Sequence, residues 1–124
     1  MKKAIEIKET TEFEEKREIE KILAIIHSNY RDIHNHNELE KTVHISAAEC
    51  SRLLRKYLNV TPMEYIRQHR ITMACRLLEE TNLSLSEIAK VCGMNPSYVS
   101  LRVRERTGLS PMSYRRYHLR KRQQ

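Results

Sequence analysis

The chain has 124 residues, enough for one compact domain or for two very small ones that share a helix. It contains only two Gly and three Pro, so long loops and tight-turned sheets have little to be made from, and 31% of its residues are charged. The formal net charge is +7, unevenly placed: residues 1–41 carry 8 Lys/Arg against 10 Asp/Glu, and residues 42–124 carry 15 against 6. A basic body behind an acidic leading part suggests a polyanionic partner for the body.

The cysteines and the apolar residues indicate the compartment. Cys50, Cys75 and Cys92 are an odd set without paired spacing, and each lies among apolar helical neighbours, so we predict small buried hydrophobic residues. The start of the chain is not followed by the apolar run of a signal peptide, and no stretch approaches the roughly 20 apolar residues of a membrane helix. We therefore expect a cytoplasmic protein with reduced thiols.

Motifs for catalysis and metal binding are missing from the sequence. There is no Gly-rich phosphate loop, no nucleophile motif and no carboxylate cluster in the basic half. The six His, including His34 and His36, fit no usual zinc spacing. We expect no enzyme, no catalytic residue, no metal, no cofactor and no site for a small-molecule effector.

In chain order, residues 1–11 are predicted to be a flexible N-terminal segment and residues 12–30 an amphipathic helix. Its apolar stripe is Ile19, Ile22, Leu23, Ile26 and Tyr30. Its acidic residues are expected to form a solvated face: Glu12, Glu14, Glu15, Glu18 and Glu20. Then follow a short helix over 36–42, a turn over 43–46, a helix over 47–57 and a linker helix over 62–80. A capping box at Ser84–Glu87 opens another short helix, followed by a turn over 92–95 and helices over 96–106 and 111–120.

The chain repeats itself with a shift of 49 positions, which places residues 38–67 on residues 87–116. Equivalent residues keep their physical roles. Ser46 and Asn95 are both predicted helix N-caps, and Asn59 and Gly108 both tolerate the left-handed conformation that ends a helix. The identical pairs are Glu38/Glu87, Lys41/Lys90, Ser51/Ser100, Arg55/Arg104, Pro62/Pro111, Met63/Met112, Tyr65/Tyr114 and Arg67/Arg116.

Each repeat contains a short helix, a tight turn and a second helix, which is a helix-turn-helix. The predicted fold is therefore all-α, with seven helices and no strand, and with two helix-turn-helix subdomains joined by a long linker helix. The expected parts are the N-terminal segment 1–11, the first subdomain 12–61, the linker helix 62–80, the second subdomain 81–118 and a basic tail 119–124.

These residues resemble the AraC/XylS family of transcription regulators. The resemblance rests on Gly-Met-Asn-Pro-Ser-Tyr over 93–98 and Thr-Gly-Leu-Ser-Pro-Met-Ser-Tyr-Arg over 107–115, and it covers about residues 12–117. Upstream it includes Tyr65-Ile66, Arg70-Ile71, Ala74 and Leu77-Leu78. The chain departs from the family in a turn after Gly93 that is one residue shorter, in His44 where a Gly is usual, and in Leu101 where an Arg is frequent.

The resemblance implies a stand-alone member of that family in a bacterial cytoplasm, associated with the nucleoid. Such a protein regulates transcription on double-stranded promoter DNA, usually as an activator that contacts RNA polymerase. The alternative is a protein-interaction module, or an antagonist of related regulators, that has lost its own base readout.

The second helix of each unit is expected to enter the major groove. A linker of about 19 residues is roughly 28 Å long, near the ~34 Å between successive major-groove faces, so we expect a monomer to span two neighbouring grooves. Arg52 is the leading base reader, because its guanidinium offers two donors to guanine O6 and N7. The base-reading candidates are Ala48, Ser51, Arg52, Arg55, Ser97, Tyr98, Leu101 and Arg102. The phosphate-contact candidates are Ser46, Lys56, Arg67, Arg104, Arg115 and Arg116.

Overall fold

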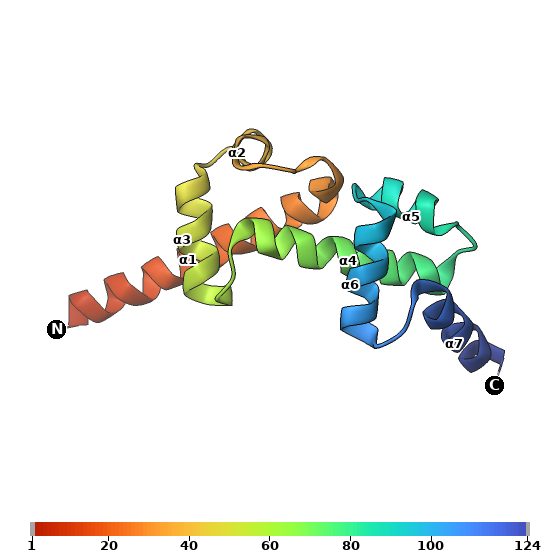
Figure 1. Ribbon diagram of the computed structural model, residues 1–124. Coiled ribbons are helices and arrows are strands. Elements are labelled where there is room, and N and C mark those ends of the chain that lie inside the picture. Colours follow the sequence, from red (N-terminus) through yellow and green to blue (C-terminus); the bar gives the residue numbers. More distant parts are fainter. Residues whose placement is uncertain (1, 124) are drawn as a thin grey trace. The chain divides into compact units, whose positions relative to one another are not determined.

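Figure 1 shows the computed structural model, which describes the backbone of residues 2–123 and the side chains of residues 11–122. Over residues 2–123 it contains seven α-helices, one 3₁₀ helix (η1, Tyr30–Asp32) and no strand, which confirms the predicted all-α class. The α-helices are α1 (Lys2–Asn29), α2 (His36–Val43), α3 (Ala47–Leu58), α4 (Pro62–Glu80), α5 (Leu85–Cys92), α6 (Pro96–Thr107) and α7 (Pro111–Gln123). None of the described helices is long and apolar enough to cross a membrane.

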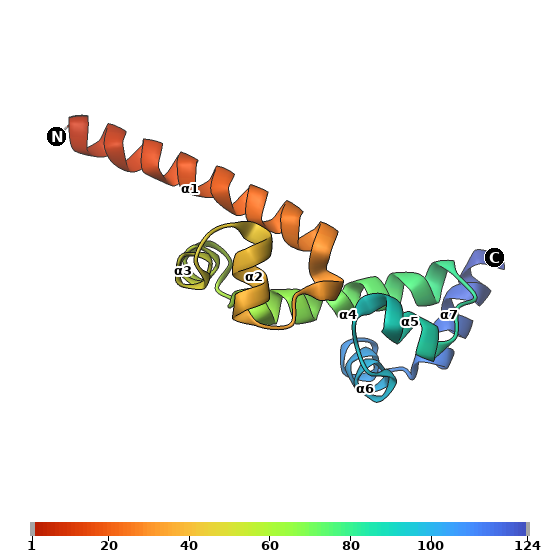
Figure 2. The same ribbon diagram turned by 90° about the horizontal axis from the view of Figure 1, so that it is seen from above.

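The chain divides into two compact units, residues 1–66 and residues 67–124, and the division falls inside α4. In the first unit, α2 and α3 both pack against α1 and against each other (Figure 2). The predicted stripe of α1 faces this core, although Leu23 is only half-buried. Each large aliphatic side chain that folding buries contributes roughly 1.5–3 kcal/mol. The buried side chains include Ile19, Ile22, Ile26, Tyr30, Leu39, Leu54 and Ile66.

The first helix is longer than its apolar stripe indicates. α1 begins at Lys2, so helical backbone runs through most of the segment 1–11 that was expected to be flexible. The prediction placed the start near residue 12, where the apolar repeat begins. Residues 2–11 contain neither Gly nor Pro, so nothing in their sequence stops the helix that follows them from extending toward the N-terminus. Met1 lies outside the described residues.

The second unit is built on α5, α6 and α7, with α6 packed against both of the others. Ile88, Val99 and Val103 are fully buried between these helices. Arg106, near the end of α6, joins that helix to α4, since its Nη1 donates to Thr72 Oγ1 at 2.7 Å and its Nη2 to the Gln68 carbonyl at 3.1 Å. The hydroxyl of Tyr114 on α7 donates to the Glu79 carboxylate on α4.

The three cysteines are buried and free of disulfides, as predicted. Cys50 and Cys92 are 0% exposed and Cys75 is 8% exposed. Desolvation raises the pKa of the Cys50 thiol to about 11, and burial also raises the pKa of Cys75. The Cys50 and Cys75 thiols therefore stay protonated near neutral pH and fill space in the cores.

The turns of both helix-turn-helix units are defined by their caps. Ser46 Oγ accepts from the Glu49 amide at 3.1 Å, and Asn95 Oδ1 accepts from the Ser97 amide at 2.8 Å. Asn59 and Gly108 end α3 and α6 in the left-handed region, with φ of 53° and 78°, as the repeat predicts. Because equivalent residues make equivalent caps, α3 and α6 start and end at the same positions of the repeat.

His44 ends α2 with φ of 61°, where the second unit has Gly93 with φ of 74°. A left-handed residue that carries a Cβ is strained by about 1 kcal/mol, part of which Gly would recover against its greater backbone entropy. We expect His44→Gly to raise the free energy of unfolding by about 0.5 kcal/mol in urea denaturation. His44→Ala, which keeps the Cβ, should give no gain; equal effects of the two substitutions would contradict the strain at His44.

Candidate nucleic-acid interface

The helix α3 has one buried face and one exposed face. Cys50, Leu53 and Leu54 point into the core of the first unit. The opposite side of the helix faces outward: Ala48, Arg52 and Arg55 are exposed, and Ser51 is half-buried. The caps at Ser46 and Asn59 fix the start, the end and therefore the register of this face. The structure thus brings the base-reading candidates of the first unit together on one helix face.

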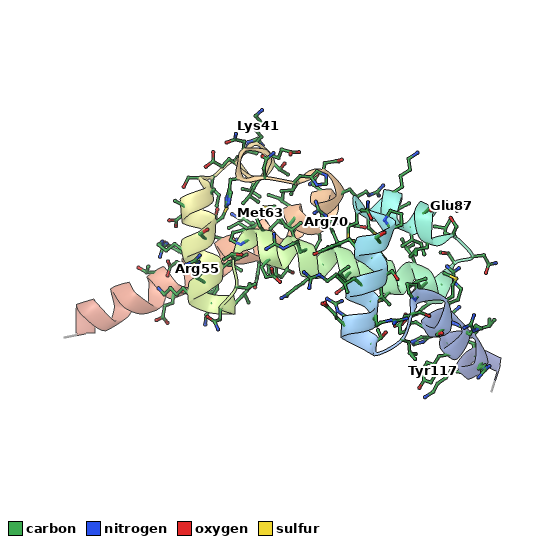
Figure 3. All side chains as sticks on the ribbon, viewed as in Figure 1. Lys41, Arg55, Met63, Arg70, Glu87 and Tyr117 are labelled. Carbon is green, nitrogen blue, oxygen red and sulfur yellow. The ribbon has the colours of Figure 1, made fainter. Side chains whose placement is uncertain are left out.

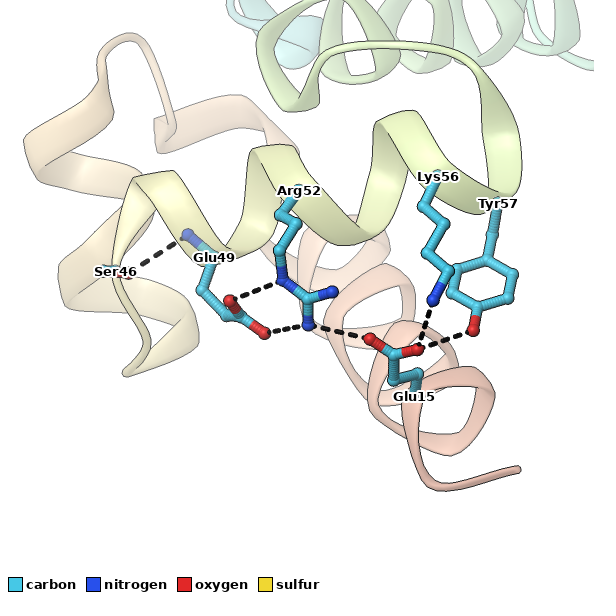
Figure 4. A network of polar contacts seen from close by, with 6 residues as sticks. All are labelled: Glu15, Ser46, Glu49, Arg52, Lys56 and Tyr57. Atoms are coloured by element: carbon cyan, nitrogen blue, oxygen red, sulfur yellow. Dashed lines mark hydrogen bonds and ion pairs between the residues drawn. The ribbon is translucent and has the colours of Figure 1, made fainter. Parts of the chain in front are cut away.

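Arg52 does not stand alone on that face. Its Nε donates to Glu49 Oε2 at 3.0 Å, and its Nη2 donates to Glu49 Oε1 at 2.7 Å (Figure 4). The same Nη2 lies 2.8 Å from Oε2 of Glu15, which belongs to α1. Both carboxylates raise the pKa of Arg52, with the Glu49 hydrogen bond as the larger cause. The leading base reader is therefore bound to two carboxylates.

Glu15 also binds two further side chains of α3. Its Oε1 accepts from Lys56 Nζ at 2.8 Å and from the Tyr57 hydroxyl at 2.7 Å. The hydrogen bonds from Lys56, Tyr57 and Arg52, in that order, lower the pKa of Glu15 to about 2. Its side chain is 11% exposed, so the expectation that Glu15 forms part of a solvated face is wrong.

The contact of Glu15 with α3 is a feature of the candidate interface that sequence reasoning missed. Glu49 precedes Arg52 by three residues, and such a pair can be read from helix periodicity. Glu15 lies 41 positions before Lys56, and nothing local distinguishes it from the other acidic residues of α1. Only the packing of α1 on α3 places the carboxylate there.

Arg55 of α3 and its repeat equivalent Arg104 of α6 are cations that no carboxylate of the described residues balances. Both are exposed (Figure 3 labels Arg55). Among the described residues neither guanidinium has a hydrogen-bond or ion-pair partner. Both lie in the last turn of a helix that is capped at each end. Among the described residues, the repeat therefore places an unpaired positive charge at the same position of α3 and of α6.

The outward face of α6 differs in chemistry from that of α3. Leu101 stands at the repeat position of Arg52 and is 54% exposed. Beside it, the Arg102 guanidinium lies 5.1 Å from the ring centre of Tyr98, and its Nη1 pairs with Glu105 at 2.8 Å. Ser97 is exposed near the start of the helix. This face therefore presents apolar and aromatic surface where α3 presents the guanidinium of Arg52.

The phosphate candidates fall into two groups. Arg115 is half-buried and donates from Nε to the Leu78 carbonyl at 3.1 Å and from Nη2 to the Leu83 carbonyl at 2.6 Å. It thus satisfies carbonyls at the end of α4 and just after it, and this use favours a structural role. The other candidates are exposed, although several make contacts of their own: Ser46, Lys56, Arg67, Arg104 and Arg116.

The lowered pKa of Glu15 predicts how the stability of the fold changes with pH. The folded value of about 2 lies below the ordinary 4.5, so the ionised carboxylate stabilises the fold above pH 4.5, and this contribution is lost as the pH falls toward 2. We expect wild type to be more stable than Glu15→Gln at neutral pH, and the difference to shrink between pH 4.5 and 2. Urea denaturation of both proteins across that range is the measurement; a difference independent of pH would contradict it.

Comparisons with known proteins agree with this geometry. The helix-turn-helix domain family matches residues 39–117. The chain is similar to the HTH-type transcriptional regulator GbdR of Pseudomonas aeruginosa, with 32% identity over 98 residues, which are 78% of this chain and 27% of GbdR. The chain spans about a third of the length of the curated relatives it matches.

Two solved structures have a similar fold. One is a transcriptional regulator of Chromobacterium violaceum, described as containing an AraC-type DNA-binding domain (TM-score 0.74, 21% identity, 83% of this chain and 93% of that chain). The other is the DNA-binding domain of the global transcriptional factor AdpA in complex with a target DNA (TM-score 0.74, 24% identity, 86% of this chain and 96% of that chain). Since the family match covers more than half of the sequence, the chain belongs to the AraC-type helix-turn-helix domain family.

Proposed function

We propose that this protein is a sequence-specific transcription regulator that binds double-stranded DNA through the outward faces of α3 and α6. The observation that carries the proposal is the equivalence of Arg55 and Arg104, two exposed cations on helices with matching caps, neither of which has a partner in the part of the chain that the structure describes. The excess of 9 positive charges over residues 42–124 (15 Lys/Arg minus 6 Asp/Glu) favours a polyanion. The complex of the similar AdpA domain with DNA supports the same partner.

The two units are expected to read different bases. In α3 the candidates are Arg52 and Arg55 with the small Ala48 and Ser51, which suits hydrogen bonds to guanine. In α6 the exposed Leu101 suits contact with a thymine methyl group. Because the two faces differ, we propose an asymmetric site bound by one monomer, with both helices in neighbouring major grooves.

We further propose that the protein acts in the cytoplasm, at promoters on the nucleoid, as an activator that contacts RNA polymerase. The support is membership of the AraC-type family together with the regulatory names of its relatives. The competing proposal is a protein-interaction module without base readout, and the exposed apolar Leu101 in the middle of α6 is the observation that favours it. Loss of sequence preference by single substitutions separates the two.

Arg52→Ala and Arg104→Ala are expected to act differently on DNA binding. A cognate duplex is first selected from a random pool, and affinities for it and for a scrambled duplex are then measured across a salt series. Arg52→Ala should weaken cognate binding on the order of tenfold and relax one base step, because it removes two base-directed donors. Arg104→Ala should weaken both duplexes equally and lower the salt slope by about one. The reverse pattern would exchange the roles of the two helices, and a wild type that selects no sequence would favour the interaction module.

One protein molecule is expected in each specific complex. The 49-residue repeat supplies two reading helices within a single chain, so no second copy is needed to cover two half-sites. Analytical sedimentation of the complex with the selected duplex should give one protein per duplex, on a site of about two helical turns. A selected palindrome occupied by two copies would overturn the monomeric arrangement.

A further inference from the structure

The guanidinium of Arg52 has donors on two sides, and the two carboxylates use them differently. Glu49 takes Nε and one N–H of Nη2, which is the side of the fork nearest the helix. Oε2 of Glu15 lies 2.8 Å from the same Nη2 and forms an ion pair with it. Among the described residues, no carboxylate pairs with Nη1 (Figure 4). A two-donor contact with guanine through Nη1 and Nη2 therefore needs the Glu15 contact to open, whereas the Glu49 contact can stay.

We infer that Glu15 determines the affinity and the base contact of the first reading helix by withholding Arg52 and Lys56 from DNA, while Glu49 positions Arg52 for the base. This inference rests on the proposed DNA-binding function. Glu15 lies on α1, outside the helix-turn-helix. It therefore changes how tightly α3 binds DNA without changing which residues α3 exposes.

The charges of the cluster support this assignment. Arg52 and Lys56 carry two positive charges, and Glu15 and Glu49 carry two negative ones, so the cluster is neutral as a whole. A phosphate that approaches Lys56 must replace a carboxylate oxygen at 2.8 Å. Binding to arbitrary DNA through these cations therefore exchanges one anion for another and gains little. Arg55 has no such partner within residues 11–122, so it is the cation of α3 that can attract phosphate without competition from a carboxylate there.

The second unit lacks this arrangement. The position equivalent to Arg52 is Leu101, and the pair Arg102–Glu105 lies within α6 itself. Among the described residues of α3 and α6, Arg52 is the arginine that pairs both with a carboxylate of its own helix and with a carboxylate of another helix. The withholding of Arg52 and Lys56 by Glu15 is thus a property of the first unit. We expect it to affect base readout by α3 and not by α6.

The test compares three substitutions that remove the same charge. Glu14 is the matched control, because it is exposed on the same helix and makes no hydrogen bond or ion pair among the described residues. Affinities of Glu15→Gln, Glu49→Gln and Glu14→Gln are measured on the selected duplex and on a scrambled one, after thermal unfolding shows that each variant is folded. We expect Glu15→Gln to bind the selected duplex about threefold to fivefold more tightly than the Glu14→Gln control, and Glu49→Gln to bind it less tightly than that control.

Two further measurements keep the inference open to refutation. In an Arg52→Ala, Lys56→Ala background, Glu15→Gln should tighten binding no more than Glu14→Gln does. In the wild type, the carboxyl carbon resonance of Glu15 should move when the selected duplex is added, because its partners leave. Equal affinities for the three single variants, weaker binding by Glu15→Gln, or an unmoved resonance at saturation would overturn the inference. Absence of any DNA binding by the wild type would instead overturn the proposed function itself.

Discussion

The arrangement of each helix-turn-helix depends on the ends of its shortest helix. α2 and α5 have eight residues each, which is too short for a helix that is stable alone in water. At their starts, Asn35 and Ser84 accept hydrogen bonds from the amides of Glu38 and Glu87. At their ends, a left-handed residue turns the chain directly toward the cap of the next helix. Because only three residues separate the two helices of each unit, these ends set the direction of the reading helix and thus everything that it exposes.

The two units have similar buried residues but different exposed residues. Cys50 and Leu54 in α3 are fully buried, as are the equivalent Val99 and Val103 in α6. Substitution there is limited by packed volume, so an apolar residue is replaced by another of similar size. On the outward side no buried volume has to be filled, and Leu101 stands in α6 where α3 has Arg52 with its carboxylate partners. The repeat therefore keeps the scaffold and leaves the exposed surface free to diverge, which is the physical argument for the asymmetric site proposed above.

The parts of this protein that sequence reasoning predicts well are those set by local chemistry. The linker helix was expected over 62–80 and is observed from Pro62 to Glu80, because Pro opens it and the next cap follows closely. The start of α1 was placed ten residues late, since an apolar stripe marks packing and not helix formation. The roles of Glu15 and Arg115 were not predictable for another reason. Both depend on partners brought together by tertiary packing, and their own neighbours in the sequence carry no sign of it.

The same contacts change what the net charge means. An excess of nine positive charges over residues 42–124 is a sound reason to expect a polyanionic partner, but a charge that is already paired contributes less to that attraction. Arg52 and Lys56 are balanced by carboxylates, and Arg115 is used for main-chain carbonyls. The positive charge that α3 offers directly to phosphate is therefore close to that of Arg55 alone. If α3 binds DNA as proposed, its small unpaired charge makes binding to arbitrary DNA weak, and its base contacts then account for a larger share of the affinity.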